Sequence, residues 1–271
     1  MRAFLFAVVV LSAATSRSAA QTGQQPNIIL TIFGGAATGH SLWSVAKQPL
    51  LLQGSNPAQY DTVGIEQSIG STIIAGASAT YFPSAHFGFH VELSYMGLPV
   101  KAGCDSVFFH PDSERKNAQT CDDIRQRASD GGAIAIFGGV TFRAASRGAI
   151  SPYGRINLGF VNESRSTIEV SGQYVISDGA HVQEVVSDPQ PRRTSVLLGF
   201  AIGFTRPISP GYQFRWEGRD QLVEQARLTG PATIQLSNGG VTGPMASHLY
   251  HHFAMTLGFD VVLEKKRGRR Y

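Results

Sequence analysis

Apolar side chains occupy every second position along several stretches of this sequence. The longest such stretch runs from Tyr60 to Tyr81, where the apolar positions share one parity and the other parity carries mainly glycine, serine and threonine. Because a β-strand points successive side chains to opposite faces, this pattern predicts strands with one apolar face and one small or polar face. The parity does not shift near Gly70, so we expect a single long strand from Tyr60 to Tyr81.

Seven further segments show the same alternation, which brings the predicted number of strands to eight. A β-strand that crosses a bilayer needs about 9–11 residues, and single-chain bacterial barrels have an even number of strands. The connections at 83–86, 144–149 and 206–211 are short, and those at about 38–59, 99–131, 163–193 and 219–249 are long. Short periplasmic turns and long external loops are typical of transmembrane barrels. The other seven strands are expected at about 27–37, 87–95, 133–143, 150–160, 195–205, 212–217 and 252–263.

The polar faces of these strands bear on whether the protein is soluble or embedded in a membrane. A soluble β-sandwich or barrel would place many Lys and Glu residues on its solvated face. Here the polar face is rich in Gly, Ala, Ser and Thr, and its few charges nearly balance. We therefore predict an all-β fold, a closed antiparallel up-and-down transmembrane β-barrel with a narrow lumen; a soluble exported β domain is the alternative. The predicted lumen charge network consists of Glu66, Glu92, Arg143, Arg155, Arg215, Glu217 and Asp260.

The N-terminal segment has the features of a secretory signal peptide. Arg2 is followed by an apolar stretch from Phe4 to Ala14, and small residues precede a cleavage site after Ala20. This stretch is too short to span a bilayer as a helix, which needs about 20 apolar residues. We expect residues 1–20 to be removed on export to the outer membrane, residues 21–263 to form the barrel, and residues 264–271 to form a basic periplasmic tail.

Charge and cysteine content exclude or favour particular sites. The formal net charge is +4, and Arg2 and Arg17 lie in the predicted signal peptide, so the mature chain is too weakly basic to indicate nucleic-acid binding. Cys104 and Cys121 are the two cysteines, and in an exported protein we expect them to form a disulfide. We predict neither a cofactor nor a metal site.

Together these patterns resemble the small eight-stranded bacterial outer-membrane β-barrel family, over about residues 26–263. The segment from Thr256 to Leu263 is similar to the family's C-terminal assembly signal, although the family usually has an aromatic residue directly after those positions, and Leu263 is aliphatic. The resemblance implies insertion by the barrel-assembly machinery and contact with outer-membrane lipid. It rests on architecture and brings no diagnostic functional motif.

The sharpest catalytic candidates are His248, His251 and His252, beside Ser247. In a strand that rises about 3.3 Å per residue, His248 and His252 lie about 13 Å apart and His251 faces the other way, which argues against a metal site. Some eight-stranded outer-membrane barrels deacylate lipid A with a His and a Ser two positions apart and a nearby carboxylate. Here Ser247 and His248 are adjacent, and position 250 is Tyr250. We expect no catalysis, with a lipid A deacylase-like enzyme as the alternative.

The lumen and the external loops are the remaining places for function. An eight-stranded barrel has an interior just wide enough for its own side chains, so paired charges favour a filled lumen over a porin-like channel. Loops on a rigid scaffold often carry binding, and the segment between Cys104 and Cys121 contains Phe108, Phe109 and His110. We expect a non-enzymatic structural or surface-interaction role carried by these loops, with a ligand that composition does not identify.

Overall fold

The computed structural model describes residues 27–144, 150–190, 193–234 and 240–263, so the predicted signal peptide (1–20) and basic tail (264–271) lie outside the described residues. The described chain is almost entirely antiparallel strand, with one helix of 11 residues, α2 (Lys116–Gln126). Across these segments no helix is long and apolar enough to cross a membrane. In chain order the strands are β1 (Asn27–Ala37), β2 (His40–Leu51), β3 (Tyr60–Ile69), β4 (Thr72–Phe82), β5 (Phe87–Phe108), β6 (Ala128–Arg143), β7 (Ser151–Glu163), β8 (Val170–Ile176), β9 (Gly179–Val186), β10 (Arg193–Ser209), β11 (Tyr212–Leu228), β12 (Thr233–Ile234), β13 (Val241–Thr242) and β14 (Met245–Leu263).

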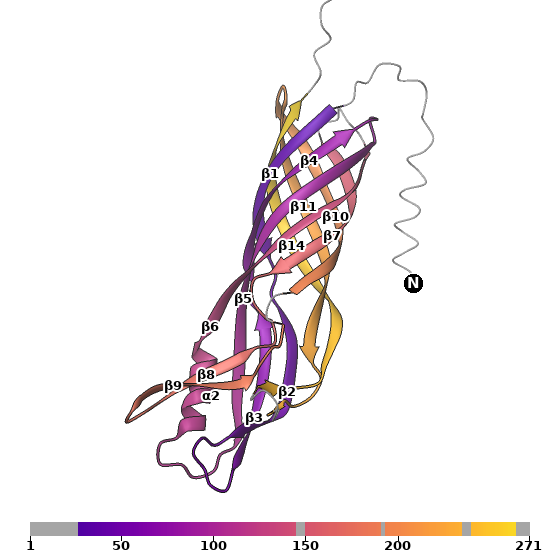
Figure 1. Cartoon of the computed structure of the whole chain (residues 1–271). Coiled ribbons are helices and arrows are strands. Elements are labelled where there is room, and N and C mark those ends of the chain that lie inside the picture. The colour runs from indigo at the N-terminus through magenta and orange to yellow at the C-terminus, as the bar shows by residue number, and fades with distance from the viewer. Residues whose placement is uncertain (1–26, 145–149, 191–192, 235–239, 264–271) are drawn as a thin grey trace, which may run out of the picture.

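Eight strands close into a ring, which confirms the predicted barrel. Around the ring the order is β1, β4, β5, β6, β7, β10, β11, β14 and back to β1. The first and last strands pair with each other, with Ile32 opposite Phe259 and Phe33 opposite Gly258. Closure leaves no strand edge whose backbone N–H and C=O groups would face lipid unpaired. Figure 1 shows this barrel as the upper part of the molecule.

The alternation in the sequence becomes an apolar outer surface on the barrel and a polar interior. Along β10, for example, Phe200 and Ile202 point outward and are 43% and 72% exposed, whereas Leu197 and Ala201 are buried. A wall of exposed large apolar side chains would be unfavourable in water and is favourable against lipid. The same outward rows appear on the other ring strands, including Ile28, Leu30, Ile32, Ile73, Tyr81, Phe89, Val91, Leu93, Ile134, Ile136, Ile156, Leu158, Phe160, Phe253, Met255 and Leu257.

The prediction of one long strand from Tyr60 to Tyr81 is wrong. The chain breaks at 70–71 into β3 and β4, and the N–H of Gly70 donates to the carbonyl of Pro99 at the break. Only β4 belongs to the ring; β3 pairs instead with β2 and with the far half of β5. Ile69 is therefore buried inside the molecule while Ile73 is 69% exposed on the barrel wall. A break of two residues preserves sequence parity, which is why alternation alone did not reveal it.

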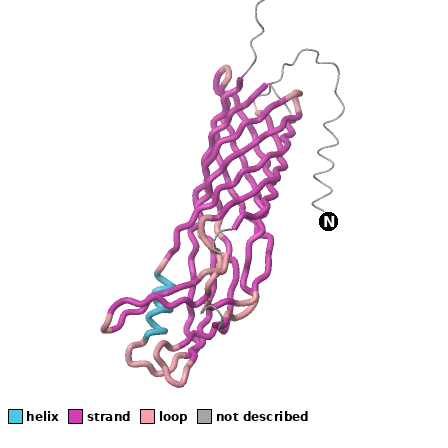
Figure 2. Tube along the Cα trace, viewed as in Figure 1, coloured by secondary structure: helices cyan, strands magenta, loops and turns pink. Residues whose placement is uncertain are grey.

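The segments that were expected to be long external loops fold into a compact unit, which we call the head. It contains β2, β3, the far end of β5, α2, β8, β9, β12, β13 and the far ends of β11 and β14, and it extends the barrel at one end (Figures 1 and 2). Its buried apolar side chains join the main core cluster of the molecule. Those in the head include Leu42, Trp43, Val45, Leu50, Val63, Ile65, Cys104, Cys121, Ile124, Ile168, Val170, Val185 and Val186.

Hydrogen bonds between distant parts of the chain hold the head together. The Nε1 of Trp43 donates to the carbonyl of Thr167 over 2.9 Å. The side chain of Gln48 makes two bonds to the backbone of Ala232, from Nε2 to the carbonyl (2.9 Å) and from the Ala232 N–H to Oε1 (2.8 Å). The hydroxyl of Tyr250 donates to the carbonyl of Leu42. Since Trp43, Gln48 and Leu42 all lie on β2, this strand ties the other external segments into one unit.

The opposite end of the barrel carries the short connections, as predicted. β4 and β5 are joined across 83–86, and β10 and β11 across a tight turn in which Gly211 has a φ of 84°. That left-handed backbone conformation favours glycine because a Cβ would clash. Most of the third predicted short link, 144–149, lies outside the described residues. The molecule therefore has short turns at one end and the head at the other.

Candidate functional site

A buried cluster of charges crosses the barrel interior. The carboxylate of Glu92 (β5) accepts from Arg219 (β11) at 2.6 Å and from Arg155 (β7) at 3.2 Å. Glu217 pairs with the same two guanidiniums, at 2.5 Å from Arg219 and 3.4 Å from Arg155. The hydroxyl of Tyr153 donates to Glu217 at 2.6 Å. Two carboxylates and two guanidiniums thus compensate one another where isolated charges would be very costly.

A second pair lies nearer the end with the short turns. Arg215 donates to Asp260 at 3.1 Å, and Asp260 also accepts from the hydroxyl of Thr31 at 2.8 Å. Arg143 belongs to neither group: its guanidinium lies over the ring of Phe82, 4.1 Å from the ring centre. Six of the seven predicted lumen charges therefore point inward, and five of them form ion pairs.

The seventh predicted lumen charge, Glu66, does not lie in the lumen. It is on β3, outside the ring, and its side chain is exposed beside Gly103. The reason is the break between β3 and β4, which turns the face of β3 that carries Glu66 outward. Conversely, Arg219 and Tyr153 were missed as members of the network. Arg219 shares the parity of Arg215 and Glu217, so a longer predicted strand would have found it.

Inward-facing apolar side chains also occupy the described barrel interior. Toward the head, the inward-facing Phe33, Ile74, Met96 and Leu197 are all buried, and Phe33 packs against the guanidinium of Arg219 at 4.5 Å. A cavity near Asp260 measures only about 10 Å³. That is about the space a single water molecule needs. The geometry is that of a packed interior, as expected for eight strands.

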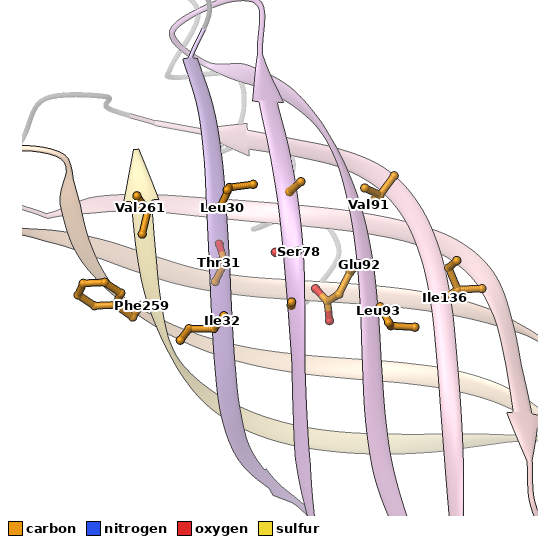
Figure 3. A pocket seen from close by; sticks show the side chains of 12 residues that line it. Leu30, Thr31, Ile32, Ser78, Val91, Glu92, Leu93, Ile136, Phe259 and Val261 are labelled. Atoms are coloured by element: carbon orange, nitrogen blue, oxygen red, sulfur yellow. The ribbon is translucent and has the colours of Figure 1, made fainter. Parts of the chain in front are cut away.

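The barrel wall carries a shallow apolar depression of about 710 Å³. The small residues Ala77 and Ala79 of β4 are part of its lining. Larger side chains, such as Leu30 on β1 and Val91 on β5, also line it (Figure 3). Small residues between larger ones produce such a depression on any strand surface. Because it opens on the apolar outer wall, we treat it as part of the lipid-facing surface.

The histidines singled out in the sequence are separated by the structure. His251 faces outward and pairs with Asp220 at 2.8 Å, whereas His252 is buried beside the ring of His40. His248 is exposed and contacts the ring of Tyr250. Among the described residues, no three His, Cys, Asp or Glu side chains are grouped so that they could hold a metal ion. Ser247 has no hydrogen bond with His248 among the described residues, whereas elsewhere in the barrel the hydroxyl of Thr141 lies 3.2 Å from Nδ1 of His90.

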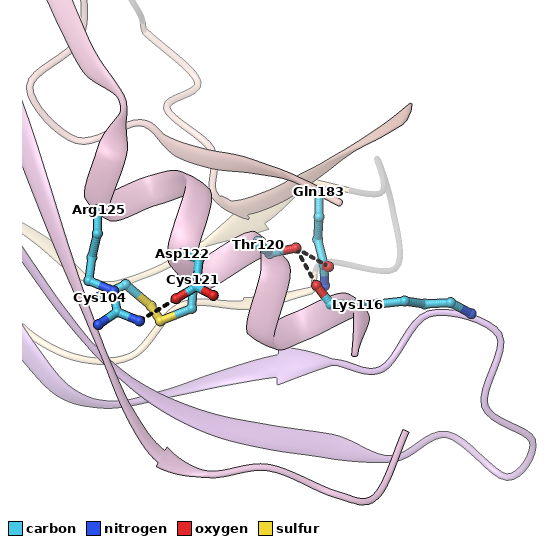
Figure 4. The surroundings of a disulfide bond; sticks show 7 residues. All are labelled: Cys104, Lys116, Thr120, Cys121, Asp122, Arg125 and Gln183. Carbon is cyan, nitrogen blue, oxygen red and sulfur yellow. Dashed lines mark hydrogen bonds and ion pairs between the residues drawn. A yellow bond between two sulfur atoms is a disulfide. The ribbon is translucent and has the colours of Figure 1, made fainter. Parts of the chain in front are cut away.

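The predicted disulfide is present in the head. Cys104 on β5 and Cys121 on α2 are bonded, with their Cα atoms 5.3 Å apart, and both are buried (Figure 4). On the same helix, Thr120 contacts Gln183 of β9 at 3.2 Å, and Gln183 donates to the carbonyl of Leu51 at 2.8 Å. α2 is therefore fixed covalently to β5 and by a hydrogen bond to β9.

Replacing both cysteines by serine should loosen the head and leave the barrel intact. The bond closes a loop with a sequence separation of 17 residues, and a crosslink of this span contributes about 3 kcal/mol. We expect amide hydrogen exchange in α2 and β8 to accelerate by roughly two orders of magnitude, which corresponds to that free energy. Heat-modifiable gel mobility, which reports the folded barrel, should stay unchanged. Unaltered exchange in α2 would show that packing alone holds the helix.

Beside the start of α2 the head has a polar cleft of about 410 Å³, which we call the α2 cleft. Asp61 of β3 lies at its base, where it accepts from the N–H of His110 (2.6 Å), from His110 Nδ1 (2.9 Å) and from the side chain of Asn117 (2.7 Å). Phe109 and Arg115 form other parts of its lining. The cleft therefore combines aromatic, cationic and amide groups on a rigid support.

Most charges around the α2 cleft are already engaged. Asp112 caps the helix by accepting from the N–H of Lys116 at 2.9 Å, and Asp122 pairs with Arg125 at 2.5 Å. The hydrogen bond that Lys116 donates to Glu114 raises the pKa of the Lys116 ammonium. The sequence pointed to this region through the aromatic residues between the cysteines, but it did not show that the start of a helix would meet Asp61.

Comparisons with known proteins give the fold but no close relative. No protein-family model matches the chain, and no curated protein matches it in sequence. The outer-membrane protein OprG from Pseudomonas aeruginosa is similar in structure, with a TM-score of 0.54, 11% identity, and coverage of 91% of this chain and 100% of that one. Neisserial surface protein A (TM-score 0.41, 10% identity, 88% and 99% covered) and the outer-membrane protein AlkL (0.42, 11%, 93% and 98%) also match. The chain has the fold of the small eight-stranded bacterial outer-membrane β-barrels.

Proposed function

We propose that this protein is a non-enzymatic outer-membrane barrel whose external head interacts with material at the cell surface. The observation that carries the proposal is the head itself: the long connections form a packed, disulfide-bonded unit tied together by β2. Surface loops without a function would not need to share a hydrophobic core. Rigid scaffolds that order their loops are typical of binding surfaces, because less entropy is lost when a ligand binds.

The filled interior supports an anchoring role for the barrel. The ion pairs around Glu92 and the apolar side chains above them occupy the space that a channel would need. Outer-membrane lipid would contact the apolar wall, and the barrel-assembly machinery would insert it. No specific observation favours the lipid-modifying alternative, since Ser247, His248 and His251 do not form one constellation in the described structure.

A headless variant tests the proposal, since the register of the ring shows where the head can be removed. In cells that display the full chain, we expect binding to at least one immobilised extracellular polysaccharide, and in cells with the headless variant we expect that binding to be lost. Heat-modifiable mobility verifies that both barrels are folded and inserted. If cells with the full chain and cells with the headless variant bind every immobilised polysaccharide equally, the proposal is contradicted. Short turns would join the paired positions Ala37 and Thr72, Gly97 and Gly132, Glu163 and Arg193, and Glu224 and Leu249.

Planar-bilayer recording tests the anchoring role of the barrel. We expect the full chain to give no large, steady openings, because the described interior retains a cavity of only about 10 Å³ near Asp260. The variant Glu92→Ala removes a central side chain of the ion-pair cluster and serves as the comparison, with an expected increase in brief openings. Steady conductance of the unmodified protein would assign it a transport function instead.

A further inference from the structure

We propose that the exposed edge of β9 binds an extended polypeptide segment, which pairs with β9 as an additional strand. The inference goes beyond the proposed function, since it assigns a second kind of partner to the head. The β8–β9 hairpin projects from one side of the head (Figures 1 and 2). Three observations carry the inference: backbone groups on β9 without partners, a protected edge on β8, and a groove that β9 lines.

The free edge of β9 follows from the register of the hairpin. A two-residue turn joins Ile176 to Gly179, and the closing pair of such a turn is hydrogen-bonded. Hydrogen-bonded and non-hydrogen-bonded pairs then alternate, so the N–H and C=O groups of Ala180, Val182 and Glu184 point away from β8. None of these backbone groups has a partner within the described chain. β9 therefore presents a row of donors and acceptors that another extended backbone would match.

The outer edge of β8, in the same hairpin, is covered. The N–H of Gln173 donates to Asp123 at 2.8 Å, and the N–H of Val175 donates to Gln119 at 2.9 Å. Both acceptors lie on α2, so the helix satisfies the outer N–H groups of β8. Strand edges that must stay unpaired are usually blunted by proline, by lysine or by a covering element. β9 contains neither proline nor lysine, so its edge is left open to another strand.

The chain itself pairs with the segment that directly follows β9. The N–H of Ser187 donates to the carbonyl of Val241 at 2.7 Å, and the N–H of Val241 donates to the hydroxyl of Ser187 at 3.1 Å. Val241 belongs to β13, so a short extended segment already lies against the chain just past the free edge. At 3.3 Å per residue the free edge from Ala180 to Glu184 is about 13 Å long, which suits about five residues of an incoming strand.

A groove of about 450 Å³ offers places for the side chains of the incoming strand, and we call it the β9 groove. Val182 and Glu184 line it on the side of β9, and Leu51 and Tyr60 line it on the side of the β2–β3 hairpin. Gln183 ties the two sides together by donating to the carbonyl of Leu51 at 2.8 Å. The side chains of Val182 and Tyr60 are exposed, so apolar residues of a bound segment would remove both from water.

Charge in the β9 groove favours a basic segment. Glu184 is the charged residue in its lining, and the other described lining residues are neutral. The carboxylate of Glu184 accepts from the hydroxyl of Ser187 at 2.6 Å, and it has no ion pair among the described residues. A lysine or arginine opposite Glu184 would form a cross-strand ion pair. The partner is therefore an extended segment with alternate apolar residues and at least one basic residue.

A second copy of this chain fits the edge less well than a single segment. Each copy would bring a two-stranded hairpin, and the β2–β3 hairpin already forms the other side of the β9 groove. The edge of a second copy would also bring Glu184 and no lysine or arginine. Two copies paired through β9 would therefore leave both carboxylates without a basic partner.

An array of heptapeptides, titrated with the full chain in detergent micelles, tests the proposal. The peptides alternate apolar residues with threonine and lysine. Each has two twins methylated at alternate amide nitrogens, one twin for each edge of the strand, and a third twin with glutamate in place of lysine. We expect saturable binding of lysine peptides and at least 10-fold weaker binding of the twin methylated on the pairing edge, because it lacks backbone donors. Glutamate twins should bind at least 3-fold more weakly, because they face Glu184.

Two variants at one position separate the backbone of β9 from its side chains. Val182→Pro removes an outward N–H and should keep the hairpin, because this N–H makes no bond to β8. It should weaken peptide binding at least 10-fold. Val182→Thr keeps the N–H and suits a strand, so it should change binding less than 3-fold. Circular dichroism and heat-modifiable mobility verify that both variants are folded.

Each outcome decides the inference. Absent binding of every lysine peptide, or equal binding of a parent peptide and both methylated twins, overturns strand addition. Equal loss in Val182→Pro and Val182→Thr overturns the role of the edge, and equal binding of the glutamate twins overturns the basic character of the partner. A dimer of the unmodified chain that Val182→Pro dissociates assigns the edge to a second copy instead.

The polysaccharide assay separates this inference from the proposed function. Cells that display Val182→Pro should still bind the polysaccharide that cells with the headless variant fail to bind. If the peptide array fails while this polysaccharide binding persists, strand addition is wrong and the proposed function stands. If the array succeeds while the full chain and the headless variant bind every polysaccharide equally, the proposed function is wrong and strand addition stands.

Discussion

Glu217→Ala lowers the free energy of unfolding by about 3–5 kcal/mol, the range for removing one partner of a buried ion pair. Glu217 is 1% exposed and joins Arg155, Arg219 and the hydroxyl of Tyr153. Its loss leaves two guanidiniums facing the single carboxylate of Glu92. Urea titration of the protein in lipid vesicles, followed by tryptophan fluorescence and gel mobility, measures the change.

Two further variants make this prediction specific. Glu66→Gln removes a carboxylate that lies outside the lumen and is exposed, so it should change stability by less than about 0.5 kcal/mol. Glu217→Ala combined with Arg219→Met removes an ion pair together and should recover part of the loss, since no unpaired cation is added. If Glu217→Ala alone were as stable as the parent protein, water would have to reach the ion-pair network and screen its charges.

Trp43→Ala should destabilise the head as a whole by about 3–5 kcal/mol, the cost of truncating a buried tryptophan. Trp43 is 5% exposed and its Nε1 donates to Thr167, 124 positions along the chain. If the head is one cooperative unit, amide exchange should accelerate in β8 and β9 as well as in the β2–β3 hairpin. Hydrogen exchange followed by mass spectrometry measures each segment separately.

Tyr60→Ala is the matched control for this effect. Tyr60 is an aromatic residue of the same β2–β3 hairpin, but it is 48% exposed. Its truncation should cost less than about 1 kcal/mol, in line with a surface position. Faster exchange in the β2–β3 hairpin alone after Trp43→Ala would instead show that the external segments fold independently.

The ring strands could be predicted because their signal is local. Each strand alternates outward apolar and inward small or polar residues, and this pattern needs no knowledge of distant contacts. The outward row of Phe253, Met255 and Leu257 and its pairing with β1 follow this rule. The bounds of β1 agree with the expected 27–37. The disulfide was also predictable, because an exported chain with two cysteines has one pairing.

The fate of Glu66 shows where local patterns fail. Alternation shows which residues share one face of a strand. It does not show which of the two faces points into the barrel after the chain has turned. The break at 70–71 leaves the odd and even positions of the sequence in step, but in β3 the odd positions point inward and in β4 they point outward. Glu66 therefore lies on the surface and not in the predicted lumen. Arg219 was missed for a related reason. β11 extends to Leu228, well past residue 217, where the apolar alternation predicted its end.

The sequence by itself determined that this chain closes into an eight-stranded barrel with charges inside, because alternation is read from neighbouring residues and lipid tolerates no open strand edge. Only the tertiary structure decided that the long connections form a head with a core and a cleft. The contacts that build it join distant positions, such as Gln48 with Ala232, 184 positions apart, and Asp61 with Asn117, 56 apart. Such contacts leave no periodic trace in the sequence, so the site proposed for the head emerges only once the chain is folded.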